Sequence, residues 1–198
     1  MIIVEIGIKL DKSIEYYDKM LRDNGATNLR NLETIDYYWT NKELCDMTEN
    51  EMKNACIRFR MCKGIKTKEM PSCRFQNYQI FRNDRENEFE SSVYELPQIE
   101  AEFYKNGYER ILETKKYDYQ YRFPGMKSTI QLQNIENVGL LVYYDNPDYY
   151  DLPVDIQRQK LIEELNSYGF EISIEQLGLD KLRTLYLNRE MYSENQNG

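Results

Sequence analysis

The sequence predicts an α+β fold in which a closed antiparallel barrel of eight strands forms a tunnel, with helices packed outside it. Eight segments are predicted as strands, and two of them, residues 2–10 and 55–62, alternate apolar and polar residues with the period of two that is typical of strands. They follow one another as in an antiparallel meander, and 18 Tyr favour strands over a helical bundle. Charged residues recur on one face of these strands. An even number of strands with such a face suggests a barrel closed around it.

Alternation is clearest in the first and third predicted strands. In the first, Ile6 and Ile8 face one side, while Glu5 and Lys9 face the other. In the third, Arg58 and Arg60 are two positions apart, so both guanidinium groups point the same way. In order, the predicted strands are residues 2–10, 28–40, 55–62, 74–82, 86–95, 108–121, 128–134 and 139–145.

Four other segments predict helices. Their apolar residues recur at helical spacing, and Asn24-Gly25 and Asn106-Gly107 are typical helix stops. The predicted helices are residues 12–24, 96–108, 154–168 and 179–187. A polar loop is expected over 41–54.

Composition excludes several classes of function. The chain has no His, 34 acidic and 26 basic residues, and a formal net charge of −8. Without His there is no Ser-His-Asp or Cys-His catalytic pair and no imidazole metal site. The negative charge argues against binding to nucleic acid or to an anionic membrane. The four Cys form no C-x-x-C pair, which suggests free thiols in a reducing compartment.

The N-terminal segment predicts no targeting signal. MIIVEIGIKL lacks the basic start and long apolar run of a signal peptide, and no apolar window is long enough to span a membrane. We therefore expect a soluble, cytoplasmic protein. The length of 198 residues fits a single domain, expected over 1–190, with a polar tail over 191–198.

The charged face of the strands has a specific chemical use if the sheet closes. Arg and Lys would hold phosphate oxygens, while carboxylates would hold Mg²⁺ or Mn²⁺, which bridges to the phosphates. No His is needed for that chemistry. If the sheet stays open, the same charges meet water, and a solvated face remains the alternative.

Six segments occur in the order of the motifs of one known family. They are VEIGIKL at 4–10, IDYYWTNKEL at 35–44, ACIRFR at 55–60, ERILETKKYDYQY at 109–121, IQLQNIENVGLLVYYD at 130–145 and DKLRTLYL at 180–187. Together they resemble the CYTH superfamily, the triphosphate-tunnel fold of class IV adenylate cyclases, thiamine triphosphatases and inorganic triphosphatases. The resemblance covers nearly the whole chain.

The resemblance implies a site for a triphosphate-containing small molecule or another polyanion. The substrate-binding residues that it implies are Lys9, Arg58, Arg60, Lys115 and Lys116. The metal ligands that it implies, for Mg²⁺ or Mn²⁺, are Glu5, Asp145 and Glu88, with Glu86 as an alternative to Glu88. No nucleic acid or membrane partner is implied, and a homodimer is one option.

The departures from the family pattern affect its carboxylates. Positions where the family has an acidic residue are Gly7, Trp39, Gln133 and Tyr143 in this chain. Two hypotheses follow. The first is metal-dependent triphosphate hydrolysis, or ATP cyclisation. The second is a noncatalytic anion-binding sensor or interaction module, because the cations are better kept than the metal ligands.

Overall fold

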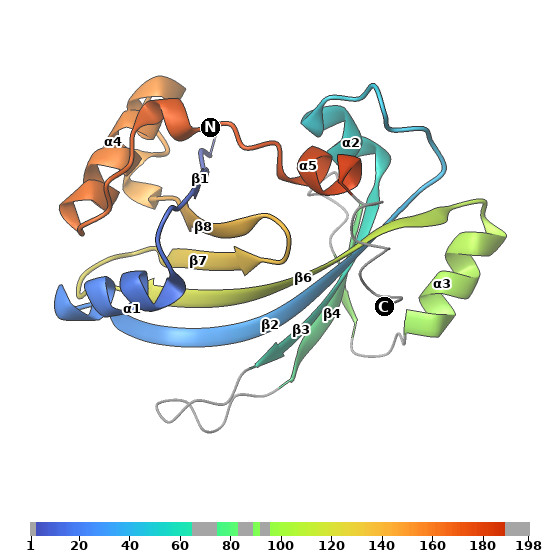
Figure 1. Ribbon diagram of the computed structural model, residues 1–198, viewed down its shortest axis with the longest axis horizontal. Coiled ribbons are helices and arrows are strands. Elements are labelled where there is room, and N and C mark those ends of the chain that lie inside the picture. Colours follow the sequence, from blue (N-terminus) through green and yellow to red (C-terminus); the bar gives the residue numbers. More distant parts are fainter. Residues whose placement is uncertain (1–2, 65–74, 83–88, 92–95, 189–198) are drawn as a thin grey trace.

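The computed structural model of the chain describes residues 3–64, 75–82, 89–91 and 96–188, in an α+β arrangement around one antiparallel sheet (Figure 1). The strands are β1 (Ile6–Lys9), β2 (Thr27–Thr40), β3 (Ile57–Gly64), β4 (Phe75–Arg82), β5 (Phe89–Ser91), β6 (Glu109–Arg122), β7 (Ile130–Ile135) and β8 (Gly139–Tyr144). The α-helices are α1 (Ile14–Asp23), α2 (Glu49–Ala55), α3 (Leu96–Lys105), α4 (Val154–Ser167) and α5 (Lys181–Leu187). Two 3₁₀ turns, Pro147–Tyr149 and Ile174–Gln176, flank α4.

The sheet is open, so the predicted closed barrel is wrong. Its strand order is β1-β8-β7-β6-β2-β3-β4-β5, and within the described residues no ladder joins β1 to β5. Alternation shows which residues share a face, but it carries no information on whether the two edges meet. The edge strands have four and three residues, against 14 each for the central β2 and β6. Such short edges offer few hydrogen bonds for closure.

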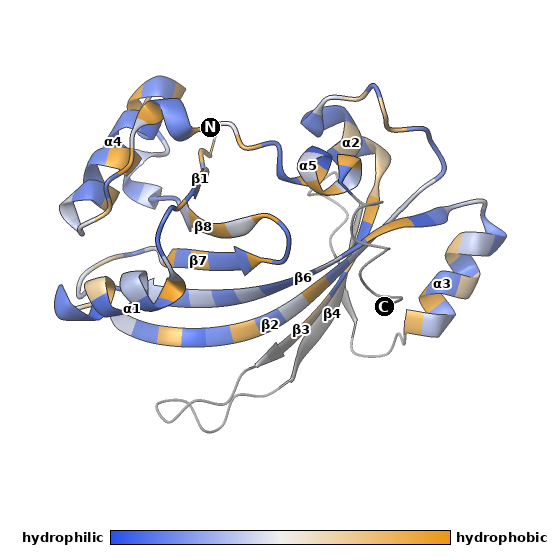
Figure 2. Cartoon of the chain, viewed as in Figure 1, coloured by the Kyte–Doolittle hydropathy of each residue, from blue (hydrophilic) through white to orange (hydrophobic). Residues whose placement is uncertain are grey.

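One face of the sheet is apolar and carries helices, as the alternation predicts. Ile6 and Ile8 of β1 are buried in a cluster with Tyr17 and Leu21 of α1 and Leu161 of α4. At the other end of this outer face, Trp39 and Phe59 pack against Ile99 of α3. Figure 2 shows the alternation of hydrophilic and hydrophobic residues along β2 and β6.

The opposite, inner face is closed at one end by two further helices. Leu182 and Leu185 of α5 pack with Met52 of α2 on Tyr38 and Leu112, which lie opposite one another on β2 and β6. Figure 1 shows α2 and α5 side by side at this end. The last helix therefore covers part of the polar face rather than the outer surface.

Helix α2 lies in the segment 41–54, so the prediction of a continuous loop there is wrong. Thr48 caps the helix, because its side chain accepts from the backbone N–H of Glu51 while the Glu51 carboxylate accepts from the backbone N–H of Thr48. This capping box was readable in the sequence as T-E-N-E. In the described residues no helix is long and apolar enough to cross a bilayer. The predicted tail, 191–198, lies outside them.

Candidate functional site

The inner face collects charged side chains from three central strands. Asp36 of β2 lies opposite Arg60 of β3 and Thr114 of β6, while Thr34 lies opposite Lys116. Paired residues of an antiparallel sheet point to the same side, as do residues two apart on one strand. Arg58, Arg60 and Lys116 therefore share this face with Asp36, and Asp118 joins them from β6.

Asp36 is the centre of the cluster. It is fully buried, its Oδ1 accepts from Arg60 Nε at 2.6 Å, and its Oδ2 accepts from Arg60 Nη2 at 2.8 Å. Lys116 Nζ, itself buried, lies 3.6 Å from Oδ2. Burial alone would raise the pKa of Asp36, but the charges of Arg60 and Lys116 outweigh it and hold that pKa well below its usual range. The carboxylate is therefore ionised, and both of its oxygens are paired with cationic side chains.

Asp118, the second buried carboxylate, is also occupied. Its Oδ2 accepts from Thr34 Oγ1 at 2.7 Å, and its Oδ1 accepts from Gln131 Nε2 at 3.3 Å. These partners come from β2 and β7, the two neighbours of β6. Hydrogen bonds from both sides hold this carboxylate in place on the sheet.

Helix α5 adds a cation that is not on the sheet. Lys181, its first residue, is partly buried, and its Nζ lies 5.8 Å from the ring centre of Tyr143 on β8. Burial, and next to it the charge of Lys116, lowers the pKa of Lys181 to about 7, with Asp36 opposing. Burial likewise lowers the pKa of Lys116. Both shifts have the same cause: positive charge is gathered where little water and few carboxylates compensate it.

The cluster therefore carries more positive than negative charge. We define the cationic cluster as Arg58, Arg60, Lys116 and Lys181, which surround the carboxylates of Asp36 and Asp118. Two buried atoms beside it, Thr114 Oγ1 and Gln133 Oε1, have no hydrogen-bond partner among the described residues. Buried polar atoms are rarely left without one unless a water or ligand serves them. The Thr114 hydroxyl is able to donate to an oxygen of an anion, whereas Gln133 Oε1 is an acceptor and needs a donor such as water.

The structure separates the remaining predicted cations from this cluster. Lys115 lies on the opposite face, where its Nζ pairs with Glu33 Oε1 at 2.8 Å, while its neighbour Lys116 points inward. Lys9 shares the inner face through its register with Leu141 but is exposed, and its side chain runs past Gly139 in the β7–β8 hairpin.

Asp145, one of the predicted metal ligands, is held by side chains outside the cationic cluster. Asp145 accepts from Ser128 Oγ at 2.7 Å and from the Tyr150 hydroxyl. The hydrogen bond to Asp145, with a smaller effect of the nearby charge of Glu5, raises the pKa of Tyr150 to about 12. The charges of Glu5 and Asp145 therefore both act on the Tyr150 hydroxyl. Glu88 and Glu86 lie outside the described residues.

These carboxylates do not form a metal site as they stand. Both oxygens of Asp36, Asp118 and Asp145 already accept hydrogen bonds from protein donors. In the described part of the chain, no three Cys, Asp or Glu side chains are grouped closely enough to hold a metal ion. Asp145 is the one predicted metal ligand that these observations cover, so the prediction of Mg²⁺ or Mn²⁺ with Glu5 and Glu88 stays a prediction.

Two of the departures from the family pattern face one another. Gly7 of β1 pairs with Tyr143 of β8, and a Cβ atom at Gly7 would lie 2.7 Å from Tyr143 Cε1. The Tyr143 ring therefore occupies the space that a side chain at Gly7 would need. Burial, and next to it the charge of Glu5, raises the pKa of Tyr143. Trp39, the third departure, lies on the outer face and packs against Phe103 of α3.

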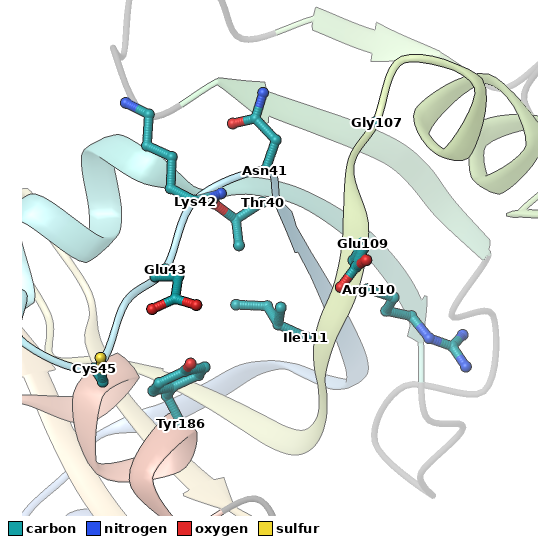
Figure 3. A pocket seen from close by; sticks show the side chains of 10 residues that line it. All are labelled: Thr40, Asn41, Lys42, Glu43, Cys45, Gly107, Glu109, Arg110, Ile111 and Tyr186. Carbon is teal, nitrogen blue, oxygen red and sulfur yellow. Dashed lines mark hydrogen bonds between the residues drawn. The ribbon is translucent and has the colours of Figure 1, made fainter.

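A separate hollow of about 650 Å³ lies where the loop after β2 meets the start of β6 (Figure 3). Ile111 and Tyr186 contribute its apolar lining. Its charged residues are balanced, because Lys42 and Arg110 are matched by Glu43 and Glu109. Unlike the cationic cluster, this hollow has no excess charge that would select an anion. Helix α5 borders both places, through Lys181 on one side and Tyr186 on the other.

Comparison with solved structures gives several similar folds, while no protein-family model and no curated protein matches the sequence. PH1819 from Pyrococcus horikoshii OT3 has a TM-score of 0.61 at 15% identity, over 96% of this chain and 98% of its own. PH1012 from the same organism has a TM-score of 0.56 at 18% identity, over 92% of this chain and 99% of its own. A proposed adenylate cyclase from Vibrio parahaemolyticus has a TM-score of 0.55 at 13% identity, over 88% of this chain and 91% of its own.

The chain shares its fold with these three proteins. At these identities the likeness concerns the fold alone. The resemblance of the sequence motifs to the CYTH superfamily therefore stays a prediction.

Sequence reasoning missed three members of the site: Asp36, Asp118 and Lys181. A signal for the first two existed, because Thr34, Asp36 and Tyr38 alternate on one strand, and Lys116 and Asp118 alternate on another. No such signal existed for Lys181. Its position depends on how the last helix docks, which the local pattern does not specify.

Proposed function

We propose that the protein binds a triphosphate-containing small molecule on the inner face of its sheet. One observation carries this proposal. Four cationic side chains from β3, β6 and α5 gather around two carboxylates on one face of a chain whose net charge is −8. Such a local reversal of charge costs desolvation energy, which a polyanion would offset by pairing with the cations.

Two further considerations support a triphosphate over a smaller anion. The cationic side chains come from three different elements, so they offer several separated contacts rather than one. The chain also shares its fold with a proposed adenylate cyclase, a type of enzyme whose substrate is a nucleoside triphosphate. The sequence motifs resemble the same superfamily.

We further propose that binding takes place without metal-dependent hydrolysis. Mg²⁺ and Mn²⁺ need carboxylate oxygens that are available to the ion. Here Asp36 is held by Arg60, Asp118 by Thr34 and Gln131, and Asp145 by Ser128 and Tyr150. Of the two hypotheses from the sequence, this arrangement favours the noncatalytic anion-binding one.

Titration calorimetry with tripolyphosphate, ATP and pyrophosphate tests the binding proposal. Charge-assisted contacts are worth about 1.5–3 kcal/mol each, so Lys116→Met and Arg58→Met should each weaken tripolyphosphate binding by about tenfold or more. Lys115→Met is the matched control, because it removes the adjacent lysine on the opposite face, and its affinity should equal that of the parent protein. Equal affinity for all three variants, or no binding by the parent protein, contradicts the proposal.

A phosphate-release assay with Mg²⁺ or Mn²⁺ tests the second part. The expected result is no release from tripolyphosphate, thiamine triphosphate or ATP above the level of a buffer control. Turnover that is lost in Arg58→Met but kept in Lys115→Met would establish the hydrolytic hypothesis instead.

A further inference from the structure

Glu49, the first residue of α2, makes contacts that the proposed binding site does not explain. It is a buried carboxylate, yet it does not cap its own helix, since Thr48 and Glu51 already form the capping box of α2. Its Oε1 accepts from the backbone N–H of Leu182 at 3.1 Å, and its Oε2 accepts from that of Arg183 at 2.7 Å. Lys53 Nζ lies 3.1 Å from Oε1 on the solvent side.

These two contacts supply a cap that α5 lacks in its own sequence. Asp180, at the N-cap position of α5, makes no side-chain capping hydrogen bond. The first N–H groups of a helix have no partner within the helix and need one from outside. Glu49, which lies more than 130 positions earlier in the chain, provides this partner.

The residue next to these two N–H groups is Lys181. Leu182 and Leu185 anchor α5 on the apolar end of the inner face, and Glu49 fixes the turn from which the Lys181 side chain leaves. The charged and titratable groups that face Lys181 come from four strands: Asp36 on β2, Arg58 and Arg60 on β3, Lys116 on β6 and Tyr143 on β8. Four of these five carry charge, and three of the four repel an ammonium group.

We propose that Glu49 is a positioning residue of the anion site, which holds the first turn of α5 so that Lys181 stays among the other cations. Lys181 would otherwise move away from like charges toward water. The two hydrogen bonds to Glu49 and the packing of Leu182 oppose that movement. The position of Lys181 rests on the structure alone, whereas its effect on anion affinity rests on the proposed function.

A lysine titration tests the positioning without any ligand. Reductive ¹³C-methylation of the lysines allows the Lys181 signal, assigned with Lys181→Arg, to be followed by NMR against pH. In the parent protein it should titrate well below the exposed lysines, whereas in Glu49→Ala it should titrate near the ordinary lysine range. Thr48→Ala is the matched control: it removes the cap of α2 itself and should leave the Lys181 titration unchanged.

Tripolyphosphate affinity is the second measurement. Glu49→Ala should weaken binding by about the same factor as Lys181→Met, roughly tenfold, and the double variant should bind no more weakly than Lys181→Met. Glu49→Gln keeps one oxygen acceptor and should show an intermediate loss. Glu49→Gln also replaces Glu49→Ala in both measurements if the alanine variant does not fold.

The outcomes separate the two proposals. A parent protein that does not bind tripolyphosphate while Glu49→Ala shifts the Lys181 titration overturns the proposed function and supports the role of Glu49. An unchanged Lys181 titration in a folded Glu49→Ala or Glu49→Gln, with only a lower melting temperature, overturns the inference and leaves Glu49 a purely structural residue.

Discussion

Asp36 and Arg60 form a two-point ion pair across β2 and β3, with hydrogen bonds of 2.6 and 2.8 Å to the two oxygens of a carboxylate that has no solvent exposure. The two residues are direct partners in the register of the strands. The sheet itself therefore fixes the geometry of the pair. Lys116, 3.6 Å away on β6, adds a second cation to the same carboxylate.

We expect Asp36→Asn to destabilise the protein by about 3–5 kcal/mol, since it leaves the buried Lys116 and the partly buried Arg60 without their carboxylate. Urea unfolding measures this loss. Glu33→Gln is the control, because it removes the partner of Lys115 in a more exposed pair and should cost less than about 1 kcal/mol. Equal losses in the two variants would contradict the central role of Asp36.

The Asp36–Arg60 pair also predicts that the stability of the protein depends on pH in the acid range. The pKa of Asp36 is lower in the folded than in the unfolded chain, so its contribution to stability is complete above the unfolded value near 3.8 and is lost as the pH falls through the folded pKa. In Asp36→Asn this part of the acid-induced loss should disappear. Urea midpoints between pH 2 and pH 5 for both proteins provide the measurement.

Lys181 predicts a second rise of stability with pH, in a higher pH range than that of Asp36. Its pKa is about 7 in the folded protein against an ordinary value of 10.5, so the unfolded chain binds more protons between these values. Stability from this group therefore rises with pH above about 7. Melting temperatures from pH 6 to pH 9 should show this rise in the parent protein and a smaller one in Lys181→Met.

Anion affinity should change in the other direction over the same range. As the pH rises through about 7, Lys181 loses its charge and tripolyphosphate binding weakens. Lys181→Arg keeps its charge throughout, so the comparison of the two proteins at each pH cancels the titration of tripolyphosphate itself. A pH profile shared by both proteins would contradict the prediction.

Gly7 and Tyr143 should be energetically coupled. A methyl group at Gly7 would lie 2.7 Å from Tyr143 Cε1, so Gly7→Ala should cost about 1–3 kcal/mol. In a Tyr143→Leu background the added methyl group has room, and the same substitution should cost much less. The two losses, measured by urea unfolding, would simply add if the residues did not compete for space.

Thr34→Val should destabilise the protein by about 1.5–3 kcal/mol, because Asp118 would lose its shorter hydrogen bond while it remains buried. Ser173→Ala, on the exposed 3₁₀ turn after α4, serves as a control for loss of a hydroxyl far from the cluster. Chemical denaturation of both variants gives the comparison.

Local pattern was sufficient for the strands and for the faces of the sheet. The alternation of Ile6 and Ile8 with Glu5 and Lys9 was correct, and Arg58 and Arg60 do point to one side. The same pattern could not decide which of Lys115 and Lys116 faces the site. Adjacent strand residues point to opposite faces, and the assignment depends on the register of the strand. Nor could it predict closure of the sheet, because closure depends on hydrogen bonds between edges that are far apart in the sequence.

The site itself was predictable only where it lies on strands. Asp36 and Asp118 stand at alternating positions beside residues that had been singled out, so a stricter use of the period of two would have found them. Lys181 and Glu49 needed the docking of two helices, and that docking is set by apolar contacts among Leu182, Leu185 and Met52.

The partnership of Glu49 with α5 also bears on biosynthesis. A ribosome releases Glu49 and the strands with Asp36 and Arg60 long before it adds residues 181–187. Until then the Glu49 carboxylate lacks the two N–H groups of α5, and the three cations on the strands lack Lys181 beside them. Under the proposed function, high-affinity binding of a polyanion would therefore begin only after residues 181–187 have been translated and have docked on the sheet.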